Sequence, residues 1–176
     1  PGLASELWFQ WEGKPLILAD PELLLDREEN KQQNTPAELQ ADHTLGQSFK
    51  SERAIGAVSV RCPTYTTPGS AVTLTLLRGG PGGERIAAER FHEIGDNAWL
   101  QLKLKQPLPP GSYYLEASEP GGRVGWWSHT EDKFARGEAF MDGNAVAGDR
   151  TLRLGFADGD TQQLLEFFTF RKPQPD

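Results

Sequence analysis

Short segments in which apolar and polar residues alternate run through most of this sequence. The clearest are residues 72–76 (Val-Thr-Leu-Thr-Leu) and 100–105 (Leu-Gln-Leu-Lys-Leu-Lys). A period of two places the apolar side chains on one face of an extended strand and the polar ones on the other. Such segments predict half-buried β-strands. Ten segments are expected to be strands: 44–49, 55–61, 71–77, 86–92, 99–105, 112–118, 123–128, 138–141, 151–156 and 164–170.

Clusters of glycine and proline separate these segments at intervals of about ten residues. Residues 79–83 (Gly-Gly-Pro-Gly-Gly) and 109–111 (Pro-Pro-Gly) are two of them. Glycine permits positive φ and proline presets φ, so each cluster ends a strand. Many short strands at this spacing indicate an all-β, antiparallel β-sandwich or a barrel, and we expect the sandwich. At most one short helix is expected, near the N-terminus, where Asp20 and Pro21 would cap it.

The length of 176 residues fits one domain. The alternating pattern begins near His43, so we expect residues 43–176 to form the sandwich and residues 1–42 to be an arm packing on it. Trp8 and Trp11 would pin this arm. The chain begins with Pro1 rather than Met, from which we expect that a natural start, with or without neighbouring modules, has been cut away.

The charge of the chain argues against several partners. The formal net charge is −7, and the 18 Lys and Arg residues form no basic run. Nucleic-acid binding draws its affinity from clustered cations, so no nucleic-acid surface is expected. An acidic surface also disfavours anionic membranes, and no apolar run is long enough to span a bilayer. A neutral or mildly charged partner is favoured.

Motifs for catalysis are absent from the sequence. The glycine-rich stretch 79–83 is not followed by Lys-Ser/Thr, so it predicts a hairpin turn and not a phosphate loop. The histidines, His43, His92 and His129, are far apart and show no metal-ligand spacing. Cys62 is expected to be a small buried residue. With 25 acidic residues, no pair can be selected for glycoside hydrolysis. We therefore expect no enzymatic activity.

The most unusual element is Gly125-Trp126-Trp127-Ser128. Two adjacent residues of a strand point to opposite faces, so one indole can enter the core while the other stands on a surface or lines a cleft. Gly125 leaves room for a close backbone approach. An exposed indole can stack on the apolar face of a sugar ring. In the alternative, both indoles are buried in the core.

The sugar hypothesis names a set of binding residues. Trp126 or Trp127 would be the stacking platform, and side chains that follow in the sequence would bond to the sugar hydroxyls. Trp99 is expected to serve in core or corner packing. The predicted ligand-binding residues are Trp126, Trp127, His129, Asp132, Arg61 and Tyr65.

Six segments, taken in order, resemble accessory β-sandwich modules of bacterial polysaccharide-degrading enzymes, of the galactose-binding-like jelly-roll type. The similarity runs from about His43 to Phe156, and its specificity comes from the order of the segments together with the Gly-Trp-Trp-Ser element. The segments are 45–49 (Leu-Gly-Gln-Ser-Phe), 55–60 (Ile-Gly-Ala-Val-Ser-Val), 72–76 (Val-Thr-Leu-Thr-Leu), 96–100 (Asp-Asn-Ala-Trp-Leu), 108–116 (Leu-Pro-Pro-Gly-Ser-Tyr-Tyr-Leu-Glu) and 124–128 (Val-Gly-Trp-Trp-Ser).

This resemblance implies a carbohydrate-binding or spacer role, and it implies export to the cell surface, the periplasm or the medium of a bacterium. Many sandwiches of this type also hold a structural calcium ion through carboxylates and carbonyls. Asp26, Glu28 and Asp42 are the candidate ligands here, although their spacing does not select among them.

Three functional hypotheses follow. The first is a non-catalytic carbohydrate-binding module of a secreted multimodular enzyme, with a glycan and neighbouring domains of the same polypeptide as partners. The second is an interaction module that packs on a catalytic domain through Trp8, Phe9 and Trp11. The third, a small polysaccharide lyase, would need a cationic groove, which fits poorly with the net charge of −7.

Overall fold

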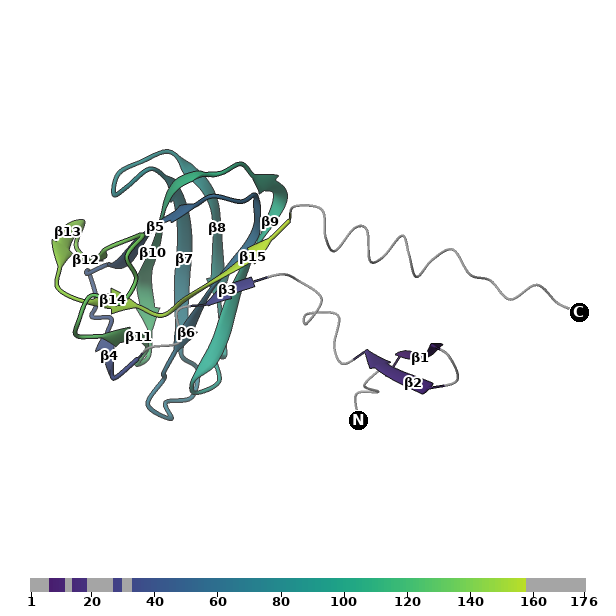
Figure 1. Ribbon diagram of the computed structural model, residues 1–176. Coiled ribbons are helices and arrows are strands. Elements are labelled where there is room, and N and C mark those ends of the chain that lie inside the picture. The colour runs from purple at the N-terminus through teal and green to yellow at the C-terminus, as the bar shows by residue number, and fades with distance from the viewer. Residues whose placement is uncertain (1–6, 12–13, 19–26, 30–32, 158–176) are drawn as a thin grey trace, which may run out of the picture.

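The structure, a computed structural model, describes residues 7–11, 14–18, 27–29 and 33–157. Every regular element in these ranges is a β-strand. The strands of all four sheets pair in antiparallel fashion (Figure 1). The all-β, antiparallel prediction is therefore confirmed. The helix expected at Asp20 and the strand expected at 164–170 lie outside the described residues. The described ranges contain no helix that could cross a membrane.

The largest sheet has the strand order β13-β12-β5-β10-β7-β8. Its central strands β5, β10 and β7 are long and largely buried, whereas β12 and β13 form a short hairpin at one edge. The strands are β5 (Leu45–Ser51), β7 (Ala71–Arg78), β8 (Arg85–Phe91), β10 (Gly111–Gly121), β12 (Ala139–Met141) and β13 (Asn144–Val146).

The second sheet has the order β3-β15-β6-β9, and a third, smaller sheet has the order β14-β11-β4. A two-stranded hairpin is formed by β1 and β2. These strands are β1 (Leu7–Trp11), β2 (Lys14–Leu18), β3 (Arg27–Glu29), β4 (Thr35–Glu38), β6 (Ile55–Cys62), β9 (Ala98–Leu108), β11 (Gly125–His129), β14 (Asp149–Arg150) and β15 (Leu152–Phe156).

The core lies between the two larger sheets, which form two layers in Figure 1. Leu74 and Leu115 from one sheet join Val58, Leu102 and Leu154 from the other in a single buried cluster, and each is at most 2 % exposed. Burial of both inner faces in one core is what defines a β-sandwich. The predicted sandwich is therefore present.

The cysteine belongs to this core. Cys62 is 2 % exposed, and burial raises the pKa of its thiol to about 12. A thiol with such a pKa carries almost no thiolate at neutral pH and is a poor nucleophile. The expectation of a small buried residue is confirmed.

A buried polar network supports the end of the domain that carries β12, β13 and β14. The carboxylate of Asp149 accepts hydrogen bonds from Gln47 Nε2 (3.1 Å) and from the backbone nitrogens of Lys133 and Phe134 (2.5 Å each). The side-chain oxygen of Gln47 accepts from the Arg150 backbone nitrogen at 2.7 Å. These bonds fix the loop between β11 and β12 to β14 and to the large sheet.

Candidate functional site

The two adjacent tryptophans of β11 point to opposite faces and differ in burial. Trp126 is 1 % exposed and belongs to the core cluster. Its indole Nε1 donates to the Thr151 carbonyl at 2.7 Å. Trp127 points to the other face and is only partly buried. The prediction that one indole enters the core and the other stays at the surface is confirmed. The prediction of Trp126 as a ligand-binding residue is wrong, because its ring is enclosed in the core and its N–H donor is already bonded to Thr151.

Gly125 positions this strand. A Cβ at residue 125 would lie 2.7 Å from the Ala37 carbonyl oxygen and 2.8 Å from the Tyr65 hydroxyl. Only a residue without a side chain lets β11 approach β4 this closely. The close backbone approach predicted for Gly125 is confirmed, and it sets the position from which Trp127 projects.

Asn97 links Trp127 to the second sheet. Trp127 Nε1 donates to Asn97 Oδ1 at 2.6 Å, and Arg61 Nε donates to the Asn97 carbonyl at 3.3 Å. Asn97 lies in the turn before β9 with φ of 61°, a left-handed conformation that asparagine tolerates better than most residues. This turn therefore brings an indole of β11 and a guanidinium of β6 to the same place.

A second indole extends the same surface. In the pairing of β6 with β9, Trp99 is the register partner of Arg61. The guanidinium carbon of Arg153 lies 3.8 Å from the centre of the Trp99 ring, which is a cation–π contact. We call the set Arg61, Asn97, Trp99, Trp127 and Arg153 the tryptophan patch.

Trp99 was expected to serve in core or corner packing, and the structure places it on the outer face of the sheet and not in the core. Leu100 and Leu102, the alternate residues of β9, are buried at 7 % and 2 % exposure, so Trp99 and Gln101 point outward. The alternating pattern of apolar and polar residues in β9 could have predicted this orientation, because an inward Leu100 requires an outward Trp99.

Tyr65 borders the patch, and its ring has a cation–π contact of the same kind as Trp99. The Arg123 guanidinium carbon lies 4.3 Å from the centre of the Tyr65 ring. Arg123 also donates from Nε and Nη2 to the two carboxylate oxygens of Glu38, at 2.8 and 3.1 Å. Burial raises the pKa of the Tyr65 hydroxyl, and the charge of Glu38 adds to this effect. Tyr65 thus stays protonated at neutral pH, beside the turn that carries Asn97.

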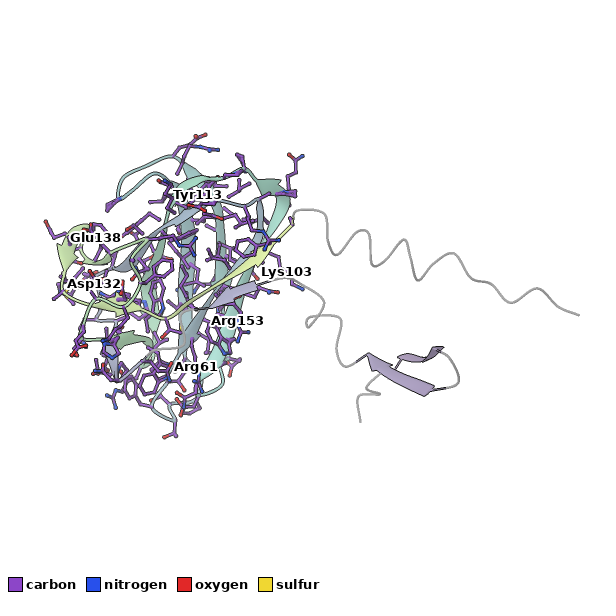
Figure 2. The ribbon with its side chains drawn as sticks, viewed as in Figure 1. Arg61, Lys103, Tyr113, Asp132, Glu138 and Arg153 are labelled. Carbon is purple, nitrogen blue, oxygen red and sulfur yellow. The ribbon has the colours of Figure 1, made fainter. Side chains whose placement is uncertain are left out.

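The two predicted polar partners are placed differently. His129 is two residues after Trp127 on β11, so it shares the face of Trp127, and its Nδ1 accepts a hydrogen bond from the Glu131 backbone nitrogen at 3.0 Å. Asp132 lies with Glu138 beside a small cavity of about 280 Å³. Figure 2 shows Asp132 and Glu138 at the left edge of the domain and Arg61 near its lower end. The structure therefore places Asp132 at this cavity and not in the tryptophan patch.

The negative charge of Asp149 raises the pKa of Asp132, with further contributions from a hydrogen bond between the two carboxyls, from burial and from Glu138. The ionised form of Asp132 is therefore disfavoured by the fold. Ionisation of Asp132 therefore lowers the stability of the folded protein. This destabilisation is absent below the ordinary carboxyl pKa and develops as the pH rises through the raised value.

We expect Asp132→Asn to raise the thermal unfolding midpoint at pH 7, because the amide donates to Asp149 without carrying charge. The difference from the parent protein should shrink as the pH falls to about 4, where the carboxyl is becoming protonated. Circular dichroism melts at the two pH values check this. A variant less stable than the parent at pH 7 would show that the carboxylate stabilises the loop.

The described ranges contain no cluster of residues that could form the predicted calcium site. No group of three or more His, Cys, Asp or Glu residues there is arranged to hold a metal ion. Asp42 is exposed. Asp26 lies outside the described residues, and nothing is described of the Glu28 side chain. The ion stays a prediction.

A groove of about 830 Å³ opens at the edge of the sandwich. It lies between β8 and β9, each of which pairs with one other strand among those described. Backbone groups on the open side of both strands therefore face the groove. Its walls are formed by residues 85–89, residues 102–106 and Leu108.

The sequence was also compared with known proteins. It matches no protein-family model and no curated protein.

Proposed function

We propose that this chain is a non-catalytic carbohydrate-binding module and that it binds sugar on the tryptophan patch. One observation carries the proposal: Trp127 is only partly buried, while its indole N–H is held by Asn97 at 2.6 Å. A ring fixed in this way loses little conformational freedom on binding, which favours affinity. Trp99, under the guanidinium of Arg153, adds a second rigid aromatic group to the same surface.

Recognition would combine stacking with hydrogen bonds. The C–H face of a sugar ring packs on an indole, and polar groups at the edge bond to its hydroxyls. Arg61 uses Nε for the Asn97 carbonyl, and a guanidinium carries five N–H donors in all. Gln101 follows Trp99 on the outer face and has both an amide donor and an acceptor. No bond of the sugar is broken in this function.

The strand order supports a jelly-roll scaffold for this module. Among β3, β5, β6, β7, β8, β9, β10 and β15, the first strand pairs with the last, the second with the seventh, the third with the sixth and the fourth with the fifth. Eight strands in two sheets, nested in this way, are the pattern of a jelly roll, an architecture common in lectins.

We place the module in a multidomain, exported bacterial enzyme that degrades polysaccharide. Binding through the patch would hold the neighbouring catalytic domain close to its substrate and so raise its effective concentration. The support for this context is the proposed binding of sugar on the tryptophan patch.

The test is Trp127→Ala, assayed on a glycan array and by affinity electrophoresis in gels containing polysaccharide. We expect loss of about fivefold in affinity, because stacking is worth on the order of 1 kcal/mol. Met141→Ala is the matched control, since Met141 is an exposed apolar side chain at 43 % exposure on β12. It should bind like the parent. The proposal is wrong if the parent protein binds no glycan, or if folded Trp127→Ala binds equally well.

The open edges of β8 and β9 favour a second candidate function, docking on a neighbouring domain. An unpaired strand edge is a template for adding a strand from another segment. In that case the groove of about 830 Å³ would hold the partner, and Trp127→Ala would leave the association unchanged. The same variant therefore separates the two functions.

A further inference from the structure

Three neighbouring strands of the second sheet carry only positive charge. β6, β9 and β15 contain four cations and neither Asp nor Glu. The whole chain has 25 acidic and 18 basic residues. The charge on these three strands is therefore opposite in sign to the net charge of the whole chain. Its cations are Arg61, Lys103, Lys105 and Arg153.

The register places these cations with the tryptophan patch. Val58, Val60, Leu100 and Leu102 point into the core. The alternate residues therefore line the outer face, where Arg61 pairs with Trp99, Ser59 with Gln101 and Ala57 with Lys103. Figure 2 shows Arg61, Arg153 and Lys103 following one another along this sheet.

The edge strand β3 offsets part of this charge. It consists of Arg27, Glu28 and Glu29, and its register places Glu29 opposite Arg153, so it adds one basic and two acidic residues. Together β3, β6, β9 and β15 contain five basic and two acidic residues, an excess of three positive charges.

The positive surface continues into the groove between β8 and β9. Lys103 and Lys105 line this groove together with Arg85, and Glu89 is the one acidic residue among its walls. Lys103 lies four residues from Trp99 on β9, a span of about 13 Å at the rise of an extended strand. A ligand that stacks on the tryptophan patch and follows β9 would therefore meet cations along its length.

We infer that the glycan bound by this module is anionic and carries carboxylate or sulfate groups. This inference rests on the proposed sugar-binding function and names its ligand class. Arginine matches a planar carboxylate with two parallel N–H donors, and lysine supplies a compact charge. The net charge of −7 does not oppose such a ligand, because attraction between exposed charges is set by those within about 10 Å.

The experiment compares each acidic polysaccharide with its neutralised form. Polygalacturonate is tested against its methyl ester, and a sulfated galactan against the desulfated polymer. The parent protein should bind at least one acidic form tenfold more tightly than its neutral partner, with affinity falling as salt rises. Preference for the uronate or for the sulfate identifies which anionic group is recognised, and either preference supports the inference.

The variants are the double substitution Lys103→Gln with Lys105→Gln, and the single substitution Arg61→Gln. Each should lower affinity for the acidic polymer about tenfold and flatten its salt dependence, while unfolding midpoints stay near that of the parent. Lys50→Gln is the matched control, because Lys50 is exposed on β5 of the other sheet. It should bind as the parent does.

The outcomes separate the two proposals. Equal binding of acidic and neutral polymers, unaffected by the lysine variants, would overturn the anionic ligand and leave sugar binding standing. Equal binding of polyglutamate, unaffected by Trp127→Ala, would overturn the inference by showing attraction to any polyanion. If no glycan of either charge binds, the proposed function itself fails.

Discussion

Replacing Trp126 with alanine is expected to lower the free energy of unfolding by about 3–5 kcal/mol. Trp126 is among the largest fully buried side chains and is 1 % exposed. Its removal opens a cavity between the sheets and also leaves the Thr151 carbonyl without the indole donor that bonds it at 2.7 Å. Urea unfolding monitored by circular dichroism measures the change.

Two further variants make this result interpretable. Trp126→Phe fills most of the space but cannot donate to Thr151, so it should cost less than alanine and still fold. Trp127→Ala removes a partly exposed ring of the same type and should cost about 1 kcal/mol or less. Similar losses for Trp126→Ala and Trp127→Ala would contradict the assignment of one indole to the core and the other to the surface.

Arg150→Ala is expected to cost about 2–4 kcal/mol, which makes it the second largest effect. Arg150 is 4 % exposed. It donates from Nε to the Gly46 carbonyl at 3.0 Å and from Nη2 to the Phe140 carbonyl at 2.6 Å. It also donates from Nη1 to Ser128 Oγ at 3.3 Å. Alanine leaves these buried acceptors without that donor.

The buried charge offsets part of this loss. Burial lowers the pKa of Arg150 to about 10, which shows that the enclosed charge has its own cost. Arg150→Met, which keeps the bulk without the charge, should therefore be less damaging than alanine. Thermal melts of both variants check the order. An alanine variant as stable as the parent would mean that the bonds of Arg150 contribute nothing to stability.

The fold could be predicted because its signals are local. Alternation of apolar and polar residues located β7 and β9, and the glycine and proline clusters located the turns between strands. The same rule of alternation showed that Trp126 and Trp127 must diverge, and Gly125 marked the close backbone approach. Each of these inferences needs only neighbouring residues.

The site could be predicted only in part because it is built from contacts distant in sequence. Arg61 and Asn97 are 36 residues apart, and Trp127 and Asn97 are 30 apart. Sequence spacing cannot give the register between such strands. For this reason Trp99 and Asn97 were not recognised as parts of a surface. Asp132 was assigned to the site only because it is close to Trp127 in the chain.

The distribution of charge over the surface also could not be predicted from the sequence. The 18 basic residues form no run along the sequence, which favoured a neutral partner. Strand pairing nevertheless gathers Arg61, Arg153 and Lys103 on one sheet. An average over the chain cannot detect a cluster that forms only when strands pair.

The most direct test of sugar binding on the tryptophan patch is the response of the indole N–H resonances to a glycan. The ¹⁵N-labelled protein would be titrated with oligogalacturonate and, separately, with its methyl ester. We predict saturable shifts of the Trp127 and Trp99 side-chain signals, with one common dissociation constant, while the Trp126 signal stays in place. Binding without any shift at Trp127 or Trp99 would place the ligand elsewhere and contradict the account.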